Sequence, residues 1–219
     1  MRVLAVDATT DHESVALVHG GRLLAEVRMV AQLHSRRLMP AIEFLLSNAG
    51  LAAQDLEAYA VTTGPGSFTG LRVGLATVQG LAVAQGAPCL GLSTLDVLAA
   101  KIEGTADALV ALMDAQRGEV FGARYDAGGR LQGDRGIGPV ESFLDGLPEL
   151  TAFFGDGVEK HQDAILARLP RALFPRRSRY LAGTLGLLAE PRLTALQGVS
   201  PADLRPLYLR GAHIRGGQP

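Results

Sequence analysis

An internal echo constrains the fold of this chain more than any other feature. Residues 3–7 and residues 110–114 are two apolar runs that each end in an aspartate. In both copies a loop, a second strand-like run and a Gly-Gly-Arg-Leu sequence follow at nearly the same spacing, the last at residues 20–23 and 128–131. Each copy is typical of three strands joined by a turn and a Gly-Gly hairpin. Repetition at this length predicts two similar lobes rather than a solenoid of short repeats.

The remainder of the first half alternates between helical and strand-like patterns. Apolar residues recur every three to four positions in residues 36–49, which is the period of a helix with one buried face. Strands that alternate with helices of this kind favour an α/β fold with a mixed sheet and crossover helices. We therefore expect helices at 36–49, 71–85 and 94–103, and strands at 57–63 and 88–92.

The second half predicts a smaller lobe of the same kind. We assign residues 1–104 to a first lobe, which contains the dimerisation helices at 36–49 and 71–85 that are considered below. Residues 105–210 are assigned to a second lobe and residues 211–219 to a disordered tail. The elements expected in the second lobe are strands near 108–113, 119–125, 130–133 and 151–154, and helices near 158–168 and 180–189.

The bulk properties exclude several classes of protein. Apolar residues make up 47% of the 219 residues, which is enough for a substantial core. The net charge of −1 gives no general attraction to nucleic acid or membranes. A single cysteine cannot form an internal disulfide and residues 1–20 show no signal peptide, so we expect a cytoplasmic protein. The longest apolar stretch, residues 71–86, is too short and too polar to span a bilayer.

A glycine-rich turn at residues 64–74 joins an expected strand to an expected helix. Its backbone N–H groups suit an anion or a close-packed partner. No Gly-Lys-Ser/Thr follows, so it is not a standard phosphate loop, and its glycines miss the dinucleotide-binding spacing. Ser67 lacks the preceding glycine of a nucleophile elbow.

Five polar residues at strand ends and turns are candidates for a vestigial nucleotide cleft. Asp7 ends the first strand and is followed by Thr9 and Thr10, while Asp114 occupies the equivalent place in the second copy. Asp156 lies in a Gly-Asp-Gly turn. Carboxylates at such places can hold Mg²⁺-bound water near phosphates. Each also suits an ordinary turn or helix cap, and neither loop has the Gly and Lys residues of a strong phosphate site.

The histidines predict no metal site. No two of the five are three to five residues apart, so no helix presents a pair of His ligands to one ion. The arginine-rich residues 168–179 leave two interpretations open, contact with tRNA phosphates or an ordinary solvated loop.

Two neighbouring helices have more apolar surface than one sheet can cover. In the helix at 71–85 apolar residues surround the axis almost completely, and three small residues four positions apart would let another helix approach closely. A subunit interface and burial within the chain's own lobe both remain open. The residues predicted for the interface are Met39, Ile42, Leu46, Leu71, Val73, Ala76, Gly80 and Ala84.

Residues 64–74, Gly-Pro-Gly-Ser-Phe-Thr-Gly-Leu-Arg-Val-Gly, resemble the characteristic sequence of the TsaB (YeaZ) family. The Asp-Ala-Thr-Thr at residue 7, the Asp-Ala-Gln-Arg-Gly-Glu-Val at residue 114 and the Gly-Asp-Gly at residue 155 are also similar to it, as is the Pro-Leu-Tyr-Leu-Arg at residue 206. The resemblance implies an ASKHA fold, the duplicated architecture of actin, sugar kinases and heat-shock chaperones. It also implies a cytoplasmic role in making threonylcarbamoyladenosine next to the tRNA anticodon.

The resemblance further implies how the protein works. Members are non-catalytic dimerisation subunits that pair with the related enzyme TsaD through the two helices described above. An ATPase subunit (TsaE-like) is expected in the same complex, and tRNA is reached through the complex. ATP and metal belong to those partners, so this chain has no cofactor of its own. The enzyme relative has an H-x-x-x-H metal pair, whereas here His34 is followed at position 38 by leucine. Whether two copies of this chain pair in isolation is left open.

A second class of function remains. ASKHA folds are commonly phosphotransferases, so a small-molecule kinase or ATPase is the alternative. A strong ATP site with a catalytic aspartate in the cleft would favour it, and the weak phosphate loops argue against it.

Overall fold

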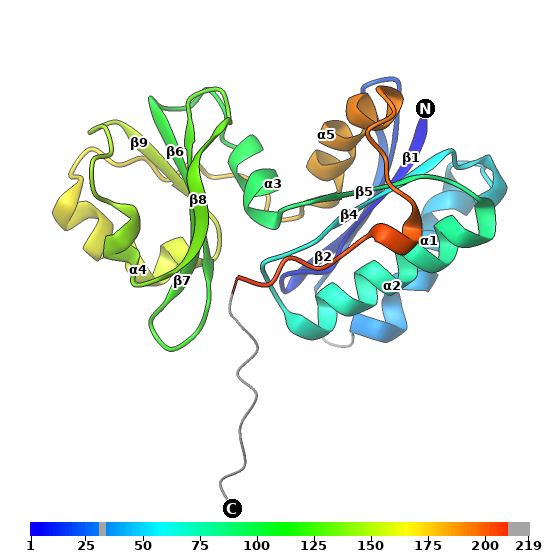
Figure 1. The fold of residues 1–219 in the computed structure, drawn as a ribbon, viewed down its shortest axis with the longest axis horizontal. Coiled ribbons are helices and arrows are strands. Elements are labelled where there is room, and N and C mark those ends of the chain that lie inside the picture. Colours follow the sequence, from blue (N-terminus) through cyan, green and yellow to red (C-terminus); the bar gives the residue numbers. More distant parts are fainter. Residues whose placement is uncertain (31–33, 210–219) are drawn as a thin grey trace, which may run out of the picture.

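The computed structural model describes residues 1–30 and 34–209, which form two lobes joined by a short helix (Figure 1). The expected tail at 211–219 lies outside the described residues. The first lobe contains a five-stranded sheet in the order β3-β2-β1-β4-β5. β2 and β3 run antiparallel to their neighbours, and β4 and β5 run parallel to β1. Its strands are β1 (Arg2–Asp7), β2 (His12–His19), β3 (Arg22–Val30), β4 (Ala58–Thr62) and β5 (Cys89–Leu92).

The second sheet repeats the first with one strand fewer. Its order is β8-β7-β6-β9, with an antiparallel three-stranded part and a parallel fourth strand. Asp7 and Asp114 end the corresponding strands β1 and β6, so the duplication predicted from the internal echo is confirmed. The strands are β6 (Ala108–Asp114), β7 (Val120–Asp126), β8 (Leu131–Gly138) and β9 (Thr151–Phe154).

Helices cover both faces of the first sheet. Figure 1 shows α1 and α2 on one side and α5 on the other. The alternation along β1 explains this, because Leu4 and Val6 pack in the cluster with α1 and α2, while Val3 and Ala5 pack in the cluster with α5. The helices are α1 (His34–Asn48), α2 (Phe68–Gln85), α3 (Thr94–Ala100), α4 (Gly157–Arg168) and α5 (Ala182–Thr194). Short 3-10 turns are found at Ala53–Asp55, Val140–Phe143 and Pro201–Asp203.

The path of the chain after α4 differs from the sequence prediction. Residues 105–210 were expected to form one lobe, but α5 contacts β1, β2 and β3 of the first sheet. Val199 pairs with Cys89 on the edge of that sheet as well. The chain therefore leaves the second lobe after α4 and returns to the first. α5 also starts later and runs longer than the expected 180–189, with Pro191 inside it.

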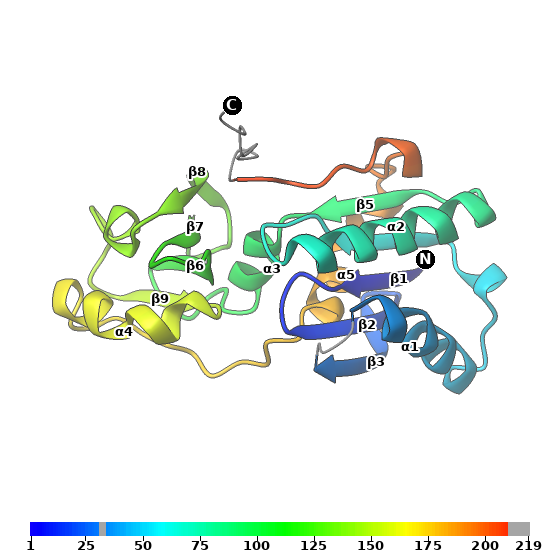
Figure 2. The ribbon, with the colours of Figure 1, turned by 90° about the horizontal axis from the view of Figure 1, so that it is seen from below.

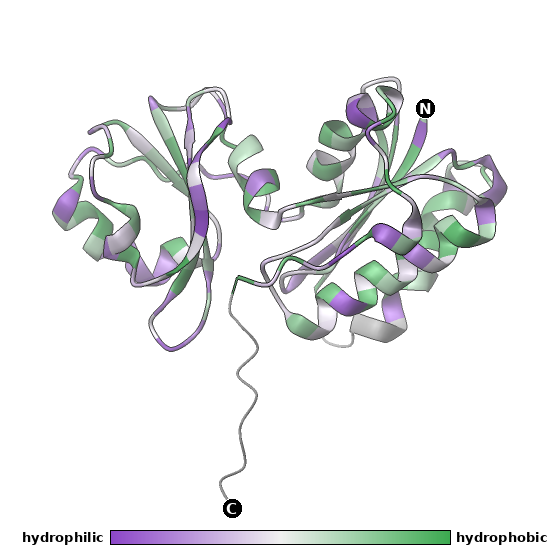
Figure 3. Cartoon of the chain, in the orientation of Figure 1, coloured by the Kyte–Doolittle hydropathy of each residue, from purple (hydrophilic) through white to green (hydrophobic). Residues whose placement is uncertain are grey.

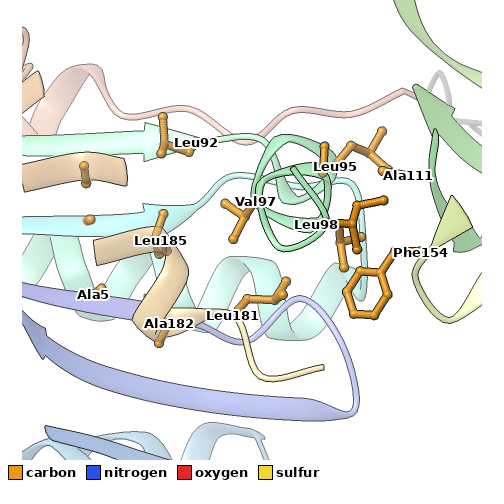
Figure 4. Close-up of a cluster of buried hydrophobic side chains, with 14 of the residues drawn as sticks. Ala5, Leu92, Leu95, Val97, Leu98, Ala111, Phe154, Leu181, Ala182 and Leu185 are labelled. Atoms are coloured by element: carbon orange, nitrogen blue, oxygen red, sulfur yellow. The ribbon is translucent and has the colours of Figure 1, made fainter. Parts of the chain in front are cut away.

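A shared hydrophobic core joins the two lobes. Leu95 and Leu98 of α3 lie between them, with Ala111 and Phe154 of the second sheet on one side and Leu185 of α5 on the other (Figure 4). Leu95 is fully buried and Leu98 is 3% exposed. Because one cluster includes residues of both sheets, the lobes are packed together rather than tethered.

Candidate functional site

The glycine-rich turn holds three parts of the chain together. The backbone N–H of Ser67 donates to the carbonyl of Thr9 (2.8 Å), and the side chain of Ser67 accepts from the N–H of Gly70 at the start of α2 (3.2 Å). Gly66 has φ +153°, and a Cβ at this position would overlap the Thr9 carbonyl. A Cβ at Gly64 would lie 2.7 Å from the carbonyl oxygen of Leu207, which is also too close. The turn therefore needs glycine at positions 64 and 66 for close packing.

Asp7 is fully buried behind the loop that follows β1. Its Oδ1 accepts hydrogen bonds from the hydroxyls of Thr9 and Thr62, both at 2.6 Å. Burial raises the pKa of this carboxyl above its ordinary value although these hydrogen bonds act to lower it. Oδ2 has no hydrogen-bond partner among the described residues.

A cleft of about 400 Å³ separates the loop after β1 from the end of β6. Of the five residues predicted for a nucleotide cleft, Thr9, Thr10, Asp114 and Asp156 line it, while Asp7 lies behind it. The structure thus brings the predicted residues together, and nucleotide binding by them stays a prediction. The other lining residues are Asp11, Gly66, Ser67, Phe68, Met113, Ala115, Gln116 and Phe121.

The two carboxylates on the second-lobe side of this cleft are already engaged. Asp114 pairs with Lys160 of α4 and accepts from the N–H of Gln116 (2.9 Å). The hydrogen bond from Lys160 lowers the pKa of Asp114, against a smaller opposing effect of burial. Asp156 accepts from the backbone N–H of Asp114 (3.1 Å), but burial dominates and raises its pKa. Within residues 1–30 and 34–209 no group of three or more His, Cys, Asp or Glu is placed to hold a metal ion.

The outer face of α2 is apolar and open. Ala76, Gly80 and Ala84 are exposed, and a Cβ built on Gly80 meets no atom within 4 Å. Val83 lies on the same face and is 68% exposed. Val73 of the same helix is half-buried. Figure 3 shows hydrophobic colouring along much of α2. We call Val73, Ala76, Gly80, Val83 and Ala84 the α2 face.

Three of the residues predicted for the interface do not belong to this surface. Ile42, Leu46 and Leu71 are between 2% and 6% exposed and pack in the core of the first lobe. On α1, Met39 is 40% exposed, as an interface residue must be, and Phe44 is 60% exposed although no prediction named it. On α1, Ile42 and Leu46 were assigned to the interface, but they lie on the side of the helix that is buried in the lobe.

An exposed aromatic group at the start of α2 was also missed. Phe68 is 56% exposed and stacks on Tyr208, with 6.0 Å between ring centroids. The guanidinium of Arg72 lies 3.9 Å from the Phe68 ring centroid. The spacing of Phe68 and Arg72, one helical turn apart, could have indicated this contact, whereas Tyr208 comes from the far end of the sequence.

The duplicated sheets and the cleft between them define the ASKHA class. A solved ROK hexokinase from Thermus thermophilus shares this fold, with a TM-score of 0.51 at 16% identity over 90% of this chain and 98% of that one. Residues 28–143 match the family model described as TsaD, tRNA N6-adenosine threonylcarbamoyltransferase.

Closer relatives identify the family within that class. The Escherichia coli tRNA threonylcarbamoyladenosine biosynthesis protein TsaB is 31% identical, over 94% of this chain and 95% of its own length. A solved Pseudomonas aeruginosa protein described as similar to peptidase YeaZ superimposes with a TM-score of 0.83. It is 32% identical over 95% of this chain and 99% of that chain. This chain belongs to the TsaB (YeaZ) family. In the part of the chain that the structure describes, no helix is long and apolar enough to cross a membrane.

Proposed function

We propose that this chain is a non-catalytic dimerisation subunit that pairs with a TsaD-like enzyme in forming threonylcarbamoyladenosine in tRNA. The α2 face is the observation that carries the proposal. Its residues are small or apolar, and α2 has no acidic residue. An exposed apolar surface of this kind is more stable when another protein covers it.

The shape of the α2 face suits a second helix. Ala76, Gly80 and Ala84 form a row of small side chains four residues apart, along which another helix can approach closely. Val83 provides a larger apolar group on this face, and Met39 and Phe44 are large apolar groups exposed on α1. In a complex they would supply the buried centre of the interface.

The family supports the identity of the partner and the pathway. The E. coli relative is named for tRNA threonylcarbamoyladenosine biosynthesis, and the matching family model describes the transferase itself. In the complex we propose, the TsaD-like subunit performs the transfer, a TsaE-like subunit supplies ATPase activity, and the complex binds the tRNA. A second copy of this chain can occupy the α2 face when the enzyme is absent.

A small-molecule kinase or ATPase is the second candidate function. The cleft between the lobes favours this function, because two loops with carboxylates face each other across a cleft whose volume is about 400 Å³. The ion pair between Asp114 and Lys160 weighs against it, since a carboxylate paired with a lysine is less available to hold a metal–phosphate group.

Gly80→Arg tests the proposed interface. The open space around Gly80 lets the free chain accept the side chain, whereas in a complex the guanidinium would be buried without a partner. Such a charge destabilises by roughly 3–5 kcal/mol, which weakens a micromolar complex to the millimolar range. We expect Gly80→Arg to abolish complex formation with the TsaD-like enzyme in size-exclusion chromatography, with an unchanged circular dichroism spectrum.

Ala167→Arg is the matched control, because Ala167 is an exposed helical alanine on α4 in the other lobe. This variant should bind the enzyme normally. A folded Gly80→Arg protein that still binds would show that α2 is not the interface. Robust ATP turnover by the pure chain, abolished by Asp7→Ala, would instead support the kinase function.

A further inference from the structure

We propose that the segment between Leu173 and α5, residues 174–180, binds RNA phosphates through Arg176 and Arg177. The proposal rests on the proposed function, in which the RNA is the tRNA substrate. Figure 2 shows this segment, in gold, running along the edge of the molecule from the second lobe toward α5. After Leu173, which bridges to β9, it forms no helix or strand.

Ion pairing divides the arginines of this region into two groups. Arg176 and Arg177 are exposed, and among the described residues neither has a carboxylate within ion-pair distance. The others have partners: Arg168 with Asp145 (2.9 Å), Arg171 with Glu149 (3.3 Å), and Arg179 with Glu159. Three of the arginines are therefore neutralised locally, and two are free to meet an external anion.

Further positive charge gathers where the segment reaches the first lobe. The Lys101 ammonium donates to the carbonyl of Tyr180 (2.8 Å), and the Arg28 guanidinium lies 5.3 Å from the Tyr180 ring centroid. Burial is the main cause that lowers the pKa of Lys101. Glu26 and, more weakly, Asp7 act to raise this pKa, whereas Arg28 and, most weakly, Arg177 lower it further. Glu26 itself pairs with Arg28 at 2.6 Å. Cations exceed nearby carboxylates here, although the whole chain has a net charge of −1.

A groove of about 400 Å³ runs beside the two unpaired arginines. Its wall includes the half-buried Phe174 and Pro175, next to Phe153 of β9. A guanidinium presents a planar set of donors that matches a phosphate, and an adjoining aromatic or apolar wall can receive a base or ribose. This combination fits a nucleic-acid strand better than an acidic protein surface, which needs no apolar groove beside its contacts.

The test measures binding of a fluorescein-labelled, unmodified tRNA transcript by anisotropy across a range of salt concentrations. The protein is the full chain, alone and in complex with the TsaD-like enzyme. We expect the Arg176→Ala/Arg177→Ala double variant to bind roughly tenfold more weakly at low salt. Each lost phosphate contact should also reduce the slope of log K against log salt by about 0.7–0.9. A purely structural role would not change that slope.

Arg168→Ala/Arg171→Ala is the matched control, because it removes two arginines of the same region that already have carboxylate partners. Its affinity and slope should equal those of the wild type. Equal slopes for both double variants would overturn the proposal, as would no tRNA binding by the wild-type chain in either form. If the Arg176/Arg177 variant bound tRNA normally but lost the enzyme, the segment would be a protein contact. Binding of RNA to the free chain does not depend on the α2 face, so failure of the two proposals can be told apart.

Discussion

At the scale of single residues, one buried carboxylate fastens α5 to the first sheet. Glu190 is 4% exposed and accepts hydrogen bonds from the backbone N–H groups of Gly20 and Gly21 in the β2–β3 turn, both at 2.6 Å. Burial acts to raise its pKa, but these two bonds and the amine of Met1, 3.3 Å away, outweigh it and lower the pKa below the usual value of 4.5. The ionised form therefore stabilises the fold above about pH 4.5, and this contribution disappears as the pH falls through the lowered pKa.

Glu190→Gln should accordingly lose about 1–3 kcal/mol of unfolding free energy at pH 7, because hydrogen bonds to a charged acceptor are replaced by weaker ones. The difference from the wild type should shrink as the pH falls below about 4.5. Urea unfolding between pH 3.5 and 7 measures both effects. Glu149→Gln is the control, since this carboxylate pairs with Arg171 on the surface and should contribute little. A pH-independent loss for Glu190→Gln would show that packing, not charge, is what the substitution removes.

At the scale of elements, the glycine turn before α2 depends on close backbone contact more than on an unusual torsion. Gly66→Ala would bring a Cβ into the Thr9 carbonyl, in addition to the strain of its φ of +153°. Gly86→Ala, at the end of α2, has a φ of +61° but meets nothing within 4 Å. We expect Gly86→Ala to cost about 1 kcal/mol of unfolding free energy and Gly66→Ala at least 2–3 kcal/mol, measured by urea unfolding. Similar losses for both would mean that the turn moves easily away from Thr9.

The helices show how far sequence reasoning reaches at this scale. Periodicity correctly predicted that α1 and α2 exist and that they have more apolar residues than one face can hold. It could not tell which apolar residues face outward, because that depends on how each helix is rotated against the sheet. Ile42, Leu46 and Leu71 fill the core of the lobe, whereas Val83 and Phe44 lie outside it. Residues that meet from distant parts of the chain, such as Phe68 and Tyr208, leave no local pattern to detect.

At the scale of the whole molecule, the duplication was readable because each copy ends a strand in aspartate and turns through a Gly-Gly pair. The return of the chain to the first lobe was not readable, since the composition of α5 is equally suited to either sheet. That return matters, because α5 and α3 place their side chains in one cluster with residues of both lobes. An ion pair also links the lobes. The Asp96 carboxylate of α3 pairs with the Arg135 guanidinium of β8 at 2.7 Å and accepts a hydrogen bond from the hydroxyl of the buried Tyr125 at 2.8 Å.

The shared core leads to a prediction about cooperativity. Leu98 lies on α3 between the lobes and is 3% exposed, so Leu98→Ala should leave a cavity and reduce the unfolding free energy by about 2–5 kcal/mol. Because the cluster includes both sheets, the most protected amides of β1 and of β6 should lose the same protection in hydrogen exchange followed by mass spectrometry. Leu98→Met, which nearly conserves volume, should cost less than about 1.5 kcal/mol. Loss of protection in β6 alone would mean that the second lobe opens independently, and the cleft between the lobes would then be a moving joint rather than a fixed surface.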